Sequence, residues 1–166
     1  MFNTQTKTKA KTFRIEARPA PITQALQEAL DMATAQGLRV VIGAGKHQCG
    51  GIRLHAHTEL HLEAGAELQF IPDYDAYAHT EVTVEAEQSN RAMIVATQAT
   101  ELALTGHGKI TCQGSTAFSR GDDEVMGTLV PFELRPRVMV LDSCQNVRID
   151  GITVQDSPMW TLHFVG

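Results

Sequence analysis

Apolar and polar residues alternate along the segment from residue 54 to residue 70. One parity is mostly small or aliphatic, and the other carries His, Glu and Gln. Because successive side chains of a β-strand point to opposite faces, this alternation predicts a sheet with one buried and one solvated face. The residues expected inside are Leu54, Ala56, Thr58, Leu60, Leu62, Ala64, Ala66, Leu68 and Phe70, and those expected outside are His55, His57, Glu59, His61, Glu63, Glu67 and Gln69.

Most of the chain has a sequence pattern typical of strands, and one segment has apolar residues at the spacing of a helix. Apolar residues recur at helical intervals from Ile22 to Gln36, and Gly37 lies where a helix commonly ends. Short apolar segments bounded by Gly, Asn and Asp predict strands along the rest of the sequence. These strands are predicted at 13–17, 39–42, 51–54, 59–62, 67–70, 93–96, 101–104, 109–112, 138–141, 146–149 and 152–154.

A strand, a tight glycine turn and a second strand recur three times. The copies cover 58–70, 100–112 and, more loosely, 145–154, so their starts lie 42 and 45 residues apart. Half of such an interval, about 21–22 residues, is the size expected for one coil of a solenoid. Stacked copies would build a continuous apolar column, as in a parallel β-helix. The predicted rows are Leu60, Leu102 and Val147, followed by Leu62, Leu104 and Ile149.

A β-sandwich is the alternative architecture for so many short strands. Its antiparallel hairpins favour Asn-Gly or Asp-Gly between neighbouring strands. Asp150-Gly151 is one such signal, and a second is lacking. The pattern therefore favours the β-helix.

Length and charge narrow the possible partners. The 166 residues carry 14 Lys and Arg against 19 Asp and Glu, a formal net charge of -5. This length fits one domain, and the acidic balance argues against nucleic acid as a partner. The longest apolar runs span four to five residues, so no membrane helix is predicted.

The cysteines and the start of the chain bear on compartment and boundaries. Cys49, Cys112 and Cys144 are odd in number and widely spaced, which predicts buried thiols rather than disulfides or a zinc site. Residues 1–12 are predicted to form a disordered tail, and residues 13–166 the N-terminal cap and first coils of a β-helix domain that would continue beyond residue 166. No apolar segment follows the basic start, which favours the cytoplasm and leaves secretion and the periplasm open.

Six motifs lie along residues 13–166. They are the stretch from Ile52 to Leu68, Ala44-Gly45-Lys46-His47, the turn Thr105-Gly106-His107-Gly108-Lys109-Ile110, Arg135-Pro136, Cys144-Gln145-Asn146-Val147 and Asp156-Ser157-Pro158-Met159-Trp160. Together they resemble the first coils of the polygalacturonases, glycoside hydrolase family 28. Gly43 departs from the proline usual in that family, and Thr111-Cys112 replaces an Asp-Gly pair.

This resemblance implies a fold, a reaction and a partner. The fold would be an all-β, right-handed parallel β-helix with an N-terminal capping helix. The reaction would be hydrolysis of α-1,4-galacturonosyl bonds with inversion, and the partner an acidic polysaccharide or oligogalacturonide. Inversion requires one carboxyl group that protonates the leaving oxygen and a second that activates water. In the family these groups belong to N-T-D and D-D motifs, followed by G-H-G and R-I-K motifs.

The family's catalytic motifs are not found here in a matching context. N-T-D and R-I-K are absent, Asp122-Asp123 lies in a polar loop, and Gly106-His107-Gly108 precedes that pair in a turn. We therefore expect the N-terminal portion of a longer enzyme, truncated at its C-terminus, and assign no catalytic residue. A non-catalytic carbohydrate-binding β-helix and an inactive truncated product are the alternatives. An open last coil would also favour self-association through its edge.

Four residues are candidates for substrate binding. Arg135 and Arg137 could hold a uronate carboxylate, although structural salt bridges are favoured for both. Trp160 could stack on a sugar ring, although packing between coils is favoured. His163 follows on the same segment and could face the cleft of the intact enzyme.

No cofactor and no metal are predicted. Three histidines and Glu59 share one strand face between residues 55 and 61, but exposed sheets commonly carry such side chains. The acidic loop Asp122-Asp123-Glu124 lacks the spacing of a calcium loop.

Overall fold

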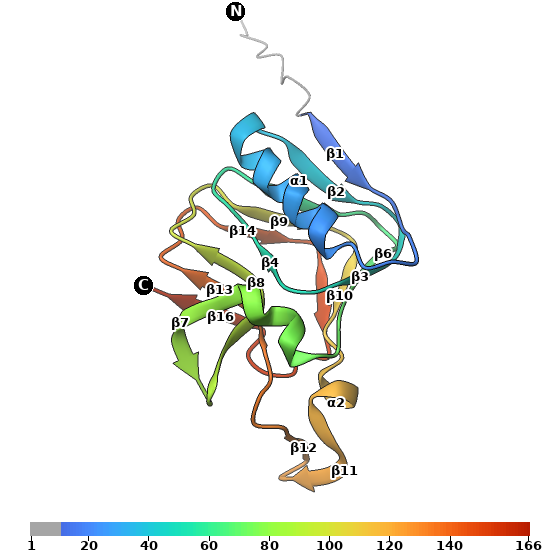
Figure 1. Ribbon diagram of the computed structural model, residues 1–166, viewed down its shortest axis with the longest axis vertical. Coiled ribbons are helices and arrows are strands. Elements are labelled where there is room, and N and C mark those ends of the chain that lie inside the picture. The colour runs from blue at the N-terminus through green and yellow to red at the C-terminus, as the bar shows by residue number, and fades with distance from the viewer. Residues whose placement is uncertain (1–10) are drawn as a thin grey trace, which may run out of the picture.

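Three parallel β-sheets wind around one apolar core in a computed structural model that describes residues 11–166 (Figure 1). Sheet A contains β1 (Thr12–Ile15), β2 (Arg39–Ile42), β5 (Glu59–Leu62), β9 (Ala103–Gly106) and β14 (Arg148–Asp150). Sheet B contains β3 (Gly45–Cys49), β6 (Ala66–Phe70), β10 (Lys109–Thr111) and β15 (Thr153–Gln155). Sheet C contains β4 (Ile52–Arg53), β8 (Ser89–Thr97), β13 (Arg137–Asp142) and β16 (Leu162–Val165).

The chain visits sheets A, B and C in turn, and it does so four times. Each strand pairs in parallel with the equivalent strand of the next coil. The predicted parallel β-helix is therefore confirmed, and the β-sandwich is not formed. Asp150-Gly151 makes the turn from β14 in sheet A to β15 in sheet B, and not a hairpin.

Two insertions enlarge the middle coils. The second coil contains the 3-10 helix η1 (Tyr74–Thr80) and β7 (Glu81–Ala86), which pairs antiparallel with β8. The third coil contains α2 (Gly114–Ala117) and the antiparallel pair β11 (Ser119–Val125) and β12 (Thr128–Pro131). The repeat intervals of 42 and 45 residues are thus single coils with insertions, and their division into coils of half that size was wrong.

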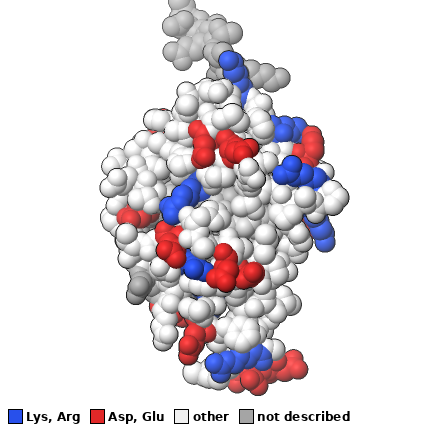
Figure 2. All heavy atoms as spheres, viewed as in Figure 1, with Lys and Arg blue, Asp and Glu red and all other residues white. Residues whose placement is uncertain are grey.

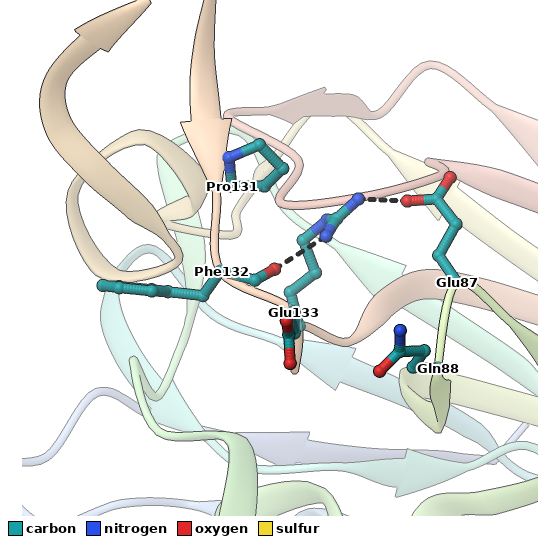
Figure 3. A pocket seen from close by; sticks show the side chains of 6 residues that line it. Glu87, Gln88, Pro131, Phe132 and Glu133 are labelled. Atoms are coloured by element: carbon teal, nitrogen blue, oxygen red, sulfur yellow. Dashed lines mark hydrogen bonds and ion pairs between the residues drawn. The ribbon is translucent and has the colours of Figure 1, made fainter.

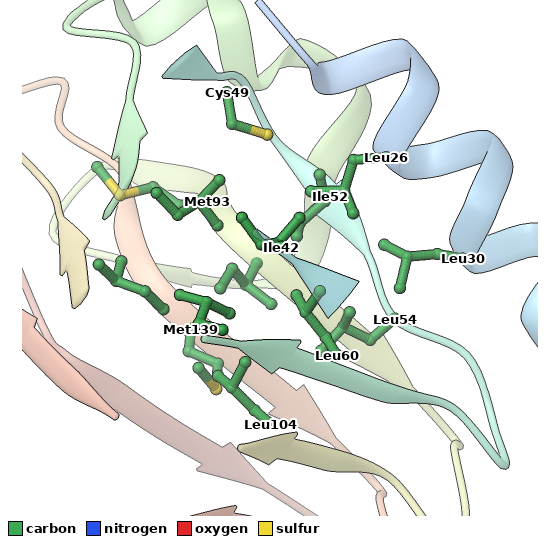
Figure 4. Packing of buried hydrophobic residues seen from close by; sticks show 14 of the residues in the cluster. Leu26, Leu30, Ile42, Cys49, Ile52, Leu54, Leu60, Met93, Leu104 and Met139 are labelled. Atoms are coloured by element: carbon green, nitrogen blue, oxygen red, sulfur yellow. The ribbon is translucent and has the colours of Figure 1, made fainter. Parts of the chain in front are cut away.

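The predicted helix covers the first coil. Helix α1 (Thr23–Gln36) ends at Gly37, whose φ of 61° is left-handed and favours glycine. Leu26 and Leu30 are fully buried, and in Figure 4 they point toward Ile52 and Leu54. The helix contacts β1, β2 and β4, so it closes this end of the apolar core.

The boundary at the start of the domain differs slightly from expectation. Strand β1 begins at Thr12, inside the range predicted as tail, and residues 1–10 lie outside the described chain. Helix α1 is the longest helix of the described residues. No described helix is long and apolar enough to cross a membrane.

Aliphatic side chains stack from coil to coil inside sheet A. Val40, Leu60, Leu104 and Ile149 occupy successive positions in one register. Leu60 therefore pairs with Leu104 and not with Leu102, so the predicted rows were wrong by two residues between the first two copies. The step from the second copy to the third is correct, because Leu104 does pair with Ile149.

A shortened turn causes this shift of two residues. Leu62 pairs with Gly106, and Glu67 pairs with Lys109. Four residues therefore lie between the paired positions in the second coil, but only two in the third. The N–H groups of His107 and Gly108 both donate to Leu62 O, at 3.0 and 3.1 Å. A Cβ atom on Gly106, whose φ is +113°, would lie 1.9 Å from that oxygen. The turn of the third coil therefore requires glycine.

Five strands were not predicted from the sequence. They are β3, β7, β11, β12 and β16. Strand β3 carries a buried histidine at an inward position, where His47 pairs with Leu68 and its Nε2 lies 2.7 Å from Gly43 O. A hydrogen-bonded imidazole replaces an aliphatic side chain there, so hydrophobicity alone does not reveal the strand.

Two glycine substitutions test the role of the short turn. Gly106→Ala should destabilise the fold by about 2–5 kcal/mol, because left-handed strain and overpacking add. Gly121→Ala is the matched control, since its φ of +64° is also positive but nothing lies within 4 Å of an added Cβ. It should cost only the strain of about 1–2 kcal/mol. Urea unfolding measures both, and equal losses would contradict the proposed contact with Leu62.

Thiol reactivity tests the burial of the core. Burial raises the pKa of Cys49 and of Cys112 to about 12, so both thiols stay protonated at neutral pH. Cys144 is only half-buried. Iodoacetamide should alkylate Cys144 first in the native protein, and Cys144→Ser should remove this fast phase. Mass spectrometry would locate the label, and rapid labelling of Cys49 would contradict the packed core.

Candidate functional site

The outer face of sheet C is partly covered by β7, which forms an antiparallel hairpin with the sheet C strand β8. Val82 of β7 packs on Ala92, Val95 and Val140, which form a second, small apolar cluster outside the main core. This cover buries β13 on both faces.

Arg137 is fully buried at the start of β13. Its Nη2 donates to Val84 O at 2.6 Å and to Ser89 O at 3.2 Å, so it ties both strands of the hairpin to sheet C. No described carboxylate lies within ion-pair distance of it, and its Nε has no hydrogen-bond partner. Burial lowers the pKa of Arg137 from its usual value, but a guanidinium remains charged at neutral pH.

His163 of β16 is the third partner of this guanidinium. Its Nδ1 lies 3.0 Å from Arg137 Nη1, and its backbone pairs with Val140. Burial first, and the neighbouring guanidinium second, lower the pKa of His163. The ring is therefore neutral near pH 7.

Trp160 lies against His163 and faces solvent. The two ring centroids are 4.6 Å apart with an interplanar angle of 70°, an edge-on contact. Trp160 is 47% exposed, so the described coils do not bury it. The structure thus brings together three of the four candidate residues, Arg137, His163 and Trp160, in one surface cluster.

Arg135 lies apart from this cluster. It forms an ion pair with Glu87 at the tip of the hairpin, and its Nη1 donates to Phe132 O at 2.7 Å. The salt bridge expected for an arginine at this point is thus confirmed for Arg135, whereas Arg137 binds carbonyl groups. The predicted binding roles of both arginines stay predictions.

A hollow of about 310 Å³ surrounds the Arg135–Glu87 pair (Figure 3). It lies between the turn of the β7–β8 hairpin and the segment that leads from β12 to β13. Phe132 turns its ring away from Gln88, and its carbonyl faces the arginine. The lining residues are Glu87, Gln88, Pro131, Phe132, Glu133 and Arg135. Sequence reasoning selected only Arg135 among them, because the others lie in loops without a pattern.

Pro131 also lines a second hollow, of about 260 Å³. Asp156 organises it: its carboxylate accepts from the Ser115 N–H at 2.8 Å, and its carbonyl accepts from the Gly114 N–H at 2.7 Å. The α2 insertion is thus fastened to the turn that precedes Trp160. Phe118 and Leu129 give this hollow an apolar wall.

The other polar candidates are occupied by neighbouring side chains. His55 contacts Asp31, His57 contacts Glu101, and His61 contacts both Arg39 and Thr105. No set of three ligating side chains suited to a metal is found among residues 11–166.

The acidic pair Asp122-Asp123 lies on the exposed strand β11, away from the coils. Basic and acidic groups are interspersed on the face shown in Figure 2, without a continuous basic surface there.

Comparisons with known proteins show which family the chain belongs to. A model of "Glycosyl hydrolases family 28" matches residues 34–166. A putative glycosyl hydrolase from Parabacteroides merdae is similar in structure with a TM-score of 0.73 and 21% identity, over 93% of this chain and 69% of that one. A search of curated proteins gave no match.

Two exopolygalacturonase structures are also similar. The Thermotoga maritima enzyme has a TM-score of 0.74 at 20% identity, over 94% of this chain and 44% of its own. The family 28 enzyme of Yersinia enterocolitica has a TM-score of 0.71 at 20% identity, over 91% and 35%. The chain therefore spans less than half the length of these two enzymes.

Titration of His163 tests the geometry of the cluster. Nuclear magnetic resonance should give a pKa below 6.5, and Arg137→Met should raise it, since one lowering cause is removed. Because the pKa of His163 is lower in the folded than in the unfolded state, the unfolded state binds a proton first as the pH falls. The free energy of unfolding should therefore decrease below about pH 6.5. A His163 pKa above 6.5 would contradict the contact with the guanidinium.

Proposed function

Because the chain belongs to glycosyl hydrolase family 28, we propose that it supplies the first coils and part of the substrate-binding surface of a polygalacturonase-like enzyme. The reaction proposed for the whole enzyme is inverting hydrolysis of α-1,4-galacturonosyl bonds. The proposed substrate is an acidic polysaccharide or an oligogalacturonide.

The cluster of Arg137, His163 and Trp160 is the observation that carries this proposal. Trp160 offers a half-exposed ring, and flat aromatic surfaces suit the apolar face of a sugar. Arg137 places a buried positive charge behind His163, and an anionic uronate would be attracted to it. Sugar rings and carboxylates are the two chemical features of a galacturonate chain. Arg135 would contribute more weakly, because Glu87 already neutralises it.

We assign the general acid and the general base to no residue of this chain. The N-T-D and R-I-K motifs are absent from the sequence. Asp122 and Asp123 lie on an exposed hairpin that projects from the coils. The proposed contribution of the described residues is therefore binding and orientation.

A non-catalytic carbohydrate-binding β-helix is the second candidate function. The same absence of the family's carboxylate motifs favours it. It would use the same cluster, but it would require no further groups for turnover. Self-association through the strands of the last described coil also stays a prediction, since β14, β15 and β16 each pair on one side only.

Binding of trigalacturonate tests the proposal. Trp160→Ala should weaken binding about five- to tenfold, the equivalent of 1–1.5 kcal/mol for one lost aromatic contact. Phe13→Ala is the control, because Phe13 is also a partly exposed aromatic side chain, 37% against 47%, and lies in β1, at the opposite edge of sheet A from the last coil. Isothermal titration calorimetry measures both, and a reducing-end assay follows turnover.

The outcomes distinguish three cases, namely hydrolysis by these residues alone, binding without hydrolysis, and no specific binding at this surface. Equal losses in both variants, or no binding by the wild type, would contradict the assigned surface. Release of reducing ends by these 166 residues alone would contradict the assignment of acid and base to groups elsewhere. Binding without turnover is the expected result.

A further inference from the structure

The contact between Arg137 and His163 fixes which ring nitrogen carries the proton. A guanidinium has only N–H donors and cannot accept a hydrogen bond. Nδ1 of His163, 3.0 Å from Arg137 Nη1, must therefore be the acceptor. In the neutral ring the proton is then on Nε2.

Nε2 of His163 is left available by the described residues. No hydrogen bond from this atom to a described group is formed, and the atom does not belong to the buried unpartnered polar atoms. The ring packs edge-on to Trp160, which is half exposed. A hydrogen-bond donor of fixed direction thus lies beside an aromatic surface.

We infer that His163 Nε2–H donates to a carboxylate oxygen of one uronate unit that stacks on Trp160, and that Arg137 is the positioning residue that holds this tautomer. The inference rests on the proposed function and assigns the recognised group and the donor atom. An oxygen acceptor is required because the ring presents a donor, and an anionic one is favoured because a positive charge lies behind the ring. Arg137 itself is fully buried, so it acts through His163 and does not touch the ligand.

The immobility of Arg137 makes it suited to this role. Its second nitrogen is held by Val84 O and Ser89 O, on the two strands of one hairpin. The guanidinium therefore cannot turn toward solvent without losing both bonds. Backbone carbonyl groups thus fix the position of the guanidinium that donates to His163 Nδ1. The tautomer of His163 is therefore set in the ligand-free protein.

A matched pair of variants at position 163 tests the donor. His163→Gln can place an amide N–H near the position of Nε2, whereas His163→Glu has similar length but offers only acceptors. With trigalacturonate as the probe, His163→Gln should stay within about threefold of wild-type affinity. His163→Glu should lose about tenfold or more, the loss expected for a hydrogen bond to a charged group. Equal affinities of the two variants would overturn the inference.

The tautomer of His163, observed by spectroscopy, tests whether Arg137 is a positioning residue. A purely structural role of Arg137 would not affect this tautomer. Protein labelled with ¹⁵N in histidine should show His163 as the Nε2–H tautomer in the absence of ligand. Arg137→Met should give a mixture of tautomers, and Arg137→Lys should restore the Nε2–H form, because lysine also donates only. If Arg137→Met does not fold, the wild-type spectrum decides alone, and an Nδ1–H signal there would overturn the inference.

The two proposals fail in different ways. If wild-type protein does not bind trigalacturonate, the proposed function fails at this surface, and the inference fails with it. If wild-type protein and His163→Glu bind it equally well, only the inference fails. A wild-type preference for trimethyl trigalacturonate over the free acid would also overturn it, since the charged acceptor would then be unnecessary.

Discussion

The stacking of each coil on the one before it is the constraint on which the structure depends. Parallel hydrogen bonds fix the register, and the register places Val40, Leu60, Leu104 and Ile149 in one column. The side chains of such a column exclude water only together, because a single coil has no core of its own. Helix α1 covers the first coil and so protects the end of the column. Gly106 is part of the same constraint, since its backbone approaches Leu62 too closely for any side chain.

The insertions are tolerated because they leave the columns untouched. Both depart from the solenoid after a sheet B strand and return to it at a sheet C strand. Strand β7 then folds back over sheet C and helps to bury Arg137. A buried guanidinium loses much hydration energy, and hydrogen bonds to two carbonyl groups and one imidazole compensate part of that loss. Such a cost is commonly found where a charged group serves binding or orientation.

Function on this scaffold belongs to loops and strand ends, while the coils supply rigidity. The Trp160–His163 pair stands at the start of β16, and Pro131 lines both hollows. All of these surfaces depend on the α2–β12 insertion or on the β7–β8 hairpin. Variation in the two insertions would therefore alter ligand contacts without disturbing the register of the coils.

The sequence by itself determined the helix with its Gly37 end, the parallel β-helix and most of the inward set from Leu60 to Phe70, because burial on one face imposes a period that local residues reveal. Ala64 was wrongly placed in that set, since it is exposed in the turn between β5 and β6. It also selected Arg135, Arg137, Trp160 and His163, although not their arrangement. Only the tertiary structure decided the pairing of Leu60 with Leu104, since a turn shortened by two residues is invisible when strands are aligned by pattern. The tertiary structure alone also gave Arg135 and Arg137 different partners, Glu87 and Ser89. Each partner is 48 residues away in sequence and is brought near only by the coiling of the chain.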